Sequence, residues 1–143
     1  MKPLKFLVLL GLLAILFGGC VGKDSQAEKQ DIVLPPGTLN AAEVSKLFSG
    51  KSVESILDKN GRVSLTYYNP DGSLRQLQGG VRRSGVWQVR EDGRICLDFA
   101  GERDRCRIIV KDGNTYFKYI VKNNGQHERI ITYRSFRDGN LVD

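Results

Sequence analysis

The sequence predicts a mainly β fold, an antiparallel meander of about seven or eight short strands forming a small barrel or sandwich, with one short N-terminal helix. Short runs of alternating apolar and polar residues recur along the chain at roughly ten-residue spacing. Residue pairs typical of hairpin turns separate these runs. The pairs are Asn60-Gly61, Asp71-Gly72, Gly79-Gly80, Ser84-Gly85, Asp92-Gly93, Gly101-Glu102, Asp112-Gly113, Asn124-Gly125 and Asp138-Gly139.

A short helix is expected over residues 40–49, ahead of the first strand. Asn40 can cap its N-terminus, Glu43 stands at the capping-box position, and Gly50 is placed to end it. One face of the helix should close over a core, since its apolar residues fall at helical spacing. These residues are Val44, Leu47 and Phe48.

The predicted strands each have one apolar face. Ile95, Leu97 and Phe99 alternate with Cys96 and Asp98, as expected for a strand with one side against a core. Residues 63–68 and 87–90 show the same alternation, and residues 116–122 and 129–136 repeat it. Closure of the sheet would protect its edge strands.

Residues 1–19 have the layout of a secretory signal, with Lys2 and Lys5 ahead of an apolar stretch over residues 6–17. This stretch is shorter than the roughly 20 apolar residues of a spanning helix. Residues 20–38 are polar, carry mixed charge and end in Pro35-Pro36-Gly37, which is typical of a flexible tether. We therefore expect one β-rich domain over residues 39–143.

Gly18 and Gly19 directly before Cys20 resemble a bacterial lipobox. The resemblance implies that the signal is removed, that Cys20 is acylated with chains such as palmitate, and that these chains anchor the protein to a membrane. Phe17 departs from the pattern, which prefers an aliphatic residue there. Val21 resembles the sorting state for the outer membrane, so we expect a cell-envelope lipoprotein facing the periplasm, on the outer rather than the inner membrane. An ordinary signal peptide followed by an unpaired Cys20 is the alternative.

With Cys20 acylated, two cysteines remain, Cys96 and Cys106. An even number in an oxidising compartment predicts a structural disulfide. A zinc site needs about four ligands, and the single histidine, His127, lies far away in the sequence, so no metal site is expected.

The cysteine pairing conflicts with a simple hairpin register. If Cys96 and Cys106 lie directly opposite each other, Cys106 shares its face with Ile108 and Val110, whereas the apolar residues beside Cys96 lie on the other face. A bulge over residues 102–104 would remove the conflict, and so would partial cover of both faces. The sequence leaves both alternatives open.

Several motifs extend over most of the predicted domain: NAAEV at 40–44, LFSG at 47–50, YNPDGSLR at 68–75, SGVW at 84–87, DGRICL at 92–97 and RC at 105–106. Together they resemble small exported domains of bacteria that carry no assigned function. The motifs are mainly turn, core and disulfide positions. The resemblance therefore implies a fold, and it brings no catalytic residues.

The chain carries 22 basic and 16 acidic residues, a formal net charge of +6. Removal of Lys2 and Lys5 with the signal lowers this charge from +6 to +4. Nucleic acid is not expected as a partner of an exported protein, so we expect an envelope protein or an anionic lipid instead. A solvated basic surface is the alternative.

Two groups of residues are candidates for binding. Tyr68 and Tyr116 belong to an aromatic set of which some members must point away from the core, although packing explains most of that set. Arginines suit phosphate or carboxylate partners, and several would cluster if the third turn lies beside the disulfide hairpin. This second group comprises Arg82, Arg83, Arg103, Arg105 and Arg107, with Lys111. Arginines scattered over strand faces are the alternative.

The sequence shows no metal-ligand spacing, nucleophile elbow or phosphate loop. His127 could act with Glu128 or Asp98 as an acid or base, but a solvated turn histidine is preferred. We therefore predict no catalytic residues and no cofactor. The favoured function is a lipid-anchored binding or structural module for a protein or a small apolar ligand. The alternative is an inhibitor of a periplasmic hydrolase that presents a Glu102-Arg103-Asp104 loop, and an enzyme is the third hypothesis.

Overall fold

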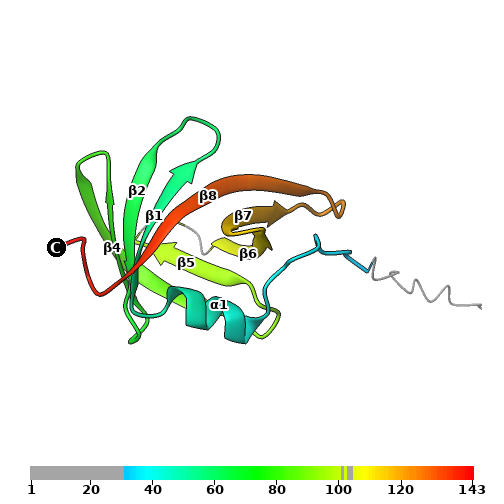
Figure 1. Cartoon of the computed structure of the whole chain (residues 1–143), viewed down its shortest axis with the longest axis horizontal. Coiled ribbons are helices and arrows are strands. Elements are labelled where there is room, and N and C mark those ends of the chain that lie inside the picture. The colour runs from blue at the N-terminus through cyan, green and yellow to red at the C-terminus, as the bar shows by residue number, and fades with distance from the viewer. Residues whose placement is uncertain (1–30, 101, 103–104) are drawn as a thin grey trace, which may run out of the picture.

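Eight antiparallel strands close into one barrel in the computed structural model, which describes residues 31–100, 102 and 105–143 (Figure 1). Each strand pairs with the next along the chain, and the last pairs with the first. The mainly β meander with one short helix is therefore confirmed, and it forms a barrel rather than a sandwich. The elements are α1 (Ala41–Phe48), β1 (Lys51–Leu57), β2 (Val63–Tyr68), β3 (Ser73–Gln78), β4 (Val81–Val89), β5 (Ile95–Phe99), β6 (Arg105–Asp112), β7 (Thr115–Val121) and β8 (His127–Asp138). The predicted signal, the predicted lipidation site Cys20 and residues 21–30 of the predicted tether lie outside the described residues.

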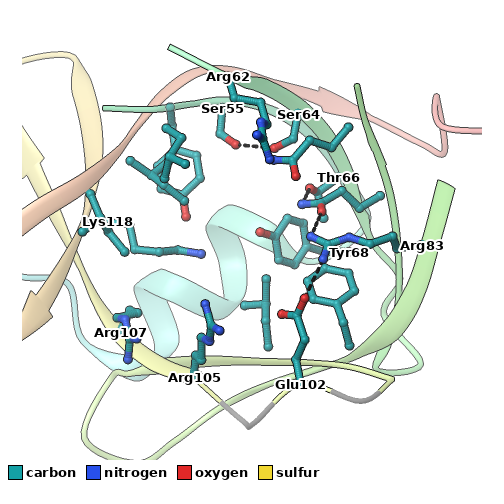
Figure 2. A pocket seen from close by; sticks show the side chains of 18 of the residues that line it. Ser55, Arg62, Ser64, Thr66, Tyr68, Arg83, Glu102, Arg105, Arg107 and Lys118 are labelled. Atoms are coloured by element: carbon teal, nitrogen blue, oxygen red, sulfur yellow. Dashed lines mark hydrogen bonds and ion pairs between the residues drawn. The ribbon is translucent and has the colours of Figure 1, made fainter. Parts of the chain in front are cut away.

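α1 lies across one end of the barrel (Figures 1 and 2), and its apolar side chains belong to the core. The predicted capping box is present, because the Asn40 side chain accepts a hydrogen bond from the Glu43 amide at 3.0 Å and the Glu43 carboxylate accepts one from the Asn40 amide at 2.8 Å. Val44 and Phe48 are fully buried. The Phe48 ring packs edge-on against three aromatic rings, which are Tyr68, Tyr133 and Phe136. The described part of the chain has no helix that is both long and apolar enough to cross a membrane.

The chain ahead of α1 hydrogen-bonds to the sheet beside β6. The Gly37 carbonyl accepts a hydrogen bond from the Lys111 amide at 2.9 Å, and the Leu39 amide donates to the Ile109 carbonyl at 2.8 Å. The pairing of β5 with β6 ends at Arg107, and these two bonds are made by residues of β6 beyond Arg107. These backbone hydrogen bonds to β6 therefore begin at Gly37, just ahead of the expected domain boundary at Leu39.

A disulfide joins Cys96 on β5 to Cys106 on β6, and the two residues lie directly opposite each other. The paired residues of this hairpin run without a register shift. Cys96, Ile108 and Val110 are buried on the face that carries the disulfide, and Ile95 and Phe99 are buried on the other face. Both faces of the hairpin are thus covered, which resolves the register conflict without a bulge among the paired residues. The disulfide closes a loop with a sequence separation of only 10 residues, and it should stabilise the fold by about 3 kcal/mol.

Two of the predicted hairpin turns are wrong. Ser84-Gly85 lies inside β4, which continues from Val81 to Val89. A Cβ atom on Gly85 would lie 2.3 Å from the Asp98 carbonyl oxygen on β5. The glycine therefore serves the close approach of two strands rather than a chain reversal. Asp138-Gly139 also makes no hairpin, because it ends β8, the last strand.

Replacing Gly85 with Ala should lower the free energy of unfolding by about 2 kcal/mol, because the two strands would have to separate to admit a methyl group. Urea unfolding at neutral pH measures this loss. Ser84→Ala is the matched control at an exposed position of the same strand, and it should change stability by less than about 0.5 kcal/mol. Equal stability of the two variants would contradict the close approach of β4 and β5.

Candidate functional site

The barrel end opposite α1 is hollow. A cavity of about 360 Å³ lies there, and all eight strands contribute side chains to its lining (Figure 2). It exists because alternate residues of each strand point inward and those near this end are too short or too polar to fill the space. Closed barrels of this size can fill their interior with side chains or hold one small ligand. The cavity is therefore the first candidate for a functional site.

The cavity has a polar side and an apolar side. Hydroxyl and amide groups of β1 to β3 form the polar side, and they bond to one another: Ser55 and Ser64 share a hydrogen bond of 2.9 Å, and Gln76 donates to the Thr66 hydroxyl at 2.9 Å. Apart from Leu57 of β1, the apolar side chains of the lining come from β5, β7 and β8 and form the other side. These are Leu97, Phe99, Ile120, Ile130 and Ile131. A ligand with both polar and apolar parts would match both sides.

Cationic side chains approach the cavity from several sides. Figure 2 shows Arg62, Arg83, Arg105, Arg107 and Lys118 arranged around it, and Glu102 is the only carboxylate among the described lining residues. Glu102 accepts a hydrogen bond from Arg83 at 2.8 Å. Arg83 also donates to the Gln76 side chain and stacks 4.3 Å from the centre of the Phe99 ring.

The other four cations have no carboxylate partner among the described residues. Their burial increases with depth: Arg62 and Arg105 are exposed at the mouth, Arg107 is half-buried, and Lys118 is only 6% exposed. Positive charge therefore exceeds negative charge in the cavity, and the excess extends inward from the solvent to the buried wall.

Lys118 on β7 is the most perturbed of these groups. Burial lowers its pKa to about 8, and the nearby positive charge of Arg107 adds to this effect. The Lys118 ammonium lies 5.9 Å from the centre of the Tyr133 ring on β8. Burial, helped by the charges of Arg105 and Arg94, also lowers the pKa of Arg107, but a guanidinium group stays protonated at physiological pH.

Two tyrosines form the inner part of the cavity, toward α1. Burial raises the pKa of Tyr68 and of Tyr133, so both hydroxyls stay protonated. The buried Tyr133 hydroxyl lies near Tyr68, but it makes no hydrogen bond of normal geometry to another described residue. Both tyrosines therefore line the cavity as neutral side chains.

The predicted binding residues divide into two groups. Tyr68, Arg83, Arg105 and Arg107 all line the cavity. Arg82 instead points out of the barrel and donates to the Val142 carbonyl at 3.3 Å, because neighbouring strand residues face opposite ways. Tyr116 lies toward the opposite end, where it packs on Phe136 and Lys111. Arg103 lies outside the described residues.

Sequence reasoning missed Arg62 and Lys118. Lys118 lies between Phe117 and Tyr119 in a strand whose two faces are both largely apolar, so the period gave no sign of which residues point inward. Arg62 lies between the Asn60-Gly61 turn and the alternating run that begins at Val63, so no strand alternation indicates its direction. The signal that could have found Lys118 is a lone charge in an otherwise apolar strand.

His127 does not line this cavity. Its Nε2 atom is buried and has no hydrogen-bond partner among the described residues, while the neighbouring Glu128 carboxylate pairs with Lys122 at 2.8 Å. No group of three metal-binding side chains occurs within residues 31–100, 102 and 105–143.

No protein-family model and no curated protein matches the chain. The function is therefore argued from the cavity.

Replacing Lys118 with Met should raise the free energy of unfolding at pH 7, because a side chain of similar length would remain without a buried charge. The Lys118 pKa is about 8 in the folded protein and has its ordinary value of 10.5 in the unfolded chain, so the unfolded state binds more protons between these values. The charge therefore destabilises the fold fully below pH 8 and progressively less up to pH 10.5. We expect a gain on the order of 2–3 kcal/mol at pH 7, falling below about 1 kcal/mol at pH 10.

Urea unfolding of both proteins at the two pH values measures this difference. Lys111→Met is the control, because Lys111 is exposed on the neighbouring strand, and it should give no pH-dependent gain. A Lys118→Met protein that is less stable than the wild type at both pH values would contradict the buried, unpaired charge.

Proposed function

We propose that this protein is a non-catalytic binding module whose barrel holds a small organic anion with an apolar body. The observation that carries the proposal is the excess of cations in the cavity. Four cationic side chains converge there without a carboxylate partner among the described residues, beside a wall of aliphatic and aromatic groups.

The electrostatics favour an anionic ligand. Removing a cation from water is costly unless an opposite charge and hydrogen bonds replace its hydration. A ligand carboxylate, phosphate or sulfonate would supply both to Lys118 and Arg107, which are the least solvated of the four. Arginine can bind such groups with two parallel hydrogen bonds. The tyrosines at the inner end stay neutral and so add no negative charge that would compete with the ligand.

The size and the apolar wall favour a ligand with a hydrocarbon part. The cavity volume of about 360 Å³ lies within the usual range of small-molecule sites. Leu97, Phe99 and Ile120 offer a surface on which such a part would lose contact with water, at about 25 cal/mol per Å². The proposal therefore refines the expected small apolar ligand to one that also carries an acidic group.

We propose further that the mature chain is anchored through a lipid on Cys20 and faces the periplasm, on the outer membrane. The signal layout and the lipobox-like residues before Cys20 support this localisation. An anchored barrel of this kind would hold or pass on amphipathic anions next to the membrane. The inhibitor alternative would use the loop after β5, in which Glu102 pairs with Arg83 at the cavity.

Decanoate should bind the protein more tightly than 1-decanol, because only the acid can pair with the arginines. Changing both Arg105 and Arg107 to Gln should weaken decanoate binding by about tenfold or more and leave decanol binding unchanged. Isothermal titration calorimetry of the two probes measures both effects.

The matched control changes Lys46 and Lys111 to Gln, which removes the same charge from positions outside this cavity. This variant should bind decanoate like the wild type. Equal affinity for the acid and the alcohol, or an equal loss in the control, would contradict a specific anion site.

A further inference from the structure

Lys118 differs chemically from the other cations around the cavity. The arginine side chains stay protonated throughout the physiological range, whereas a lysine amine becomes a nucleophile when it loses its proton. Lys118 is buried in the wall, and its pKa of about 8 gives it a neutral fraction at pH 7 that is roughly 300-fold larger than that of an ordinary lysine. The cavity therefore presents a reactive amine beside permanent positive charges.

The charged groups around Lys118 favour the neutral form of its amine. Burial and the positive charge of Arg107 on β6 disfavour a proton on the amine, and the carboxylate of Glu102 is already paired with Arg83. The tyrosines remain neutral because burial raises their pKa. The charged and titratable lining groups are therefore Arg62, Tyr68, Arg83, Glu102, Arg105, Arg107 and Tyr133.

We propose that Lys118 forms an imine with a small aldehyde or ketone that carries an anionic group. This inference rests on the proposed function, since the same cavity would hold the ligand. It assigns the anion to the arginines and the carbonyl carbon to the lysine. The bound molecule would thus be retained by a reversible covalent bond.

The reaction balances without an oxidant or a reductant. The neutral Lys118 amine attacks the carbonyl carbon and forms a C–N bond, which gives a carbinolamine. The carbonyl oxygen then leaves as water with the two hydrogens of the amine, and a C=N bond remains.

Pyridoxal 5′-phosphate is a suitable probe, because it carries an aldehyde and a phosphate. The full-length protein is incubated with the probe and sodium cyanoborohydride at pH 7, and peptide mapping by mass spectrometry locates the reduced adduct. We expect Lys118 to be labelled at least about tenfold faster than exposed lysines such as Lys111. Labelling of Lys118 at the same rate as Lys111, or slower, would overturn the inference.

Two variants separate covalent capture from anion binding. Lys118→Arg keeps the positive charge and should still bind pyridoxine 5′-phosphate, the alcohol analogue, but should form no adduct at position 118. Lys111→Arg should label like the wild type. Binding of the alcohol analogue by the wild type without an adduct on Lys118 would overturn the imine and leave the proposed function standing. Adducts of Lys118 with propanal, but no binding of either phosphate compound, would overturn the proposed function and the anionic requirement.

The pH dependence of Lys118 labelling by the neutral aldehyde propanal is a further test, because a purely structural role of Lys118 would not produce it. Labelling of Lys118 should rise with a midpoint near pH 8. Arg107→Gln removes a charge that lowers the pKa, so the midpoint should move to higher pH and labelling at pH 7 should slow roughly 3- to 10-fold. Arg105→Gln removes an arginine at the exposed mouth and should have a smaller effect. An unchanged midpoint in Arg107→Gln would contradict this account of the amine.

Discussion

Closure of the sheet is the constraint on which the structure depends. In a closed barrel every second residue of a strand must point inward, and no edge strand remains to absorb an error in register. The Cys96–Cys106 bond lies on the outer face of its hairpin, so Arg105 and Arg107 on either side of Cys106 point into the barrel. Because α1 covers one end, these charged side chains lie at the other end, where they line the cavity.

The fold was predictable from the sequence to the level of its hairpins. Turn pairs and alternating runs located the strands, and the Asn40 capping box located the helix. Barrel and sandwich were not distinguishable, because both bury one face of each strand and differ only in whether β1 meets β8. Ser84-Gly85 was misassigned because the same dipeptide suits a turn and a close approach of strands, and only the position of Asp98 separates the two.

The cavity was predictable only in part. Arginines were recognised as a group, but adjacent ones such as Arg82 and Arg83 face opposite ways, and their direction depends on the register across several strands. The inward direction of Arg105 and Arg107 follows from the disulfide together with closure, and neither constraint suffices alone. Lys118 is a lone charge in a strand that is apolar on both faces, so the sequence does not indicate which way it points, and its burial near Arg107 emerges only from the closed sheet.

The most direct measurement is anomalous diffraction from a crystal of the protein soaked briefly in bromide. Bromide is a small anion without shape requirements, so it reports where the molecule concentrates accessible positive charge. The account predicts a bromide inside the barrel, within contact distance of the side chains of Arg107 and Lys118. Bromide sites confined to the outer surface, with an empty cavity, would contradict the claim that the barrel interior is an anion-binding site.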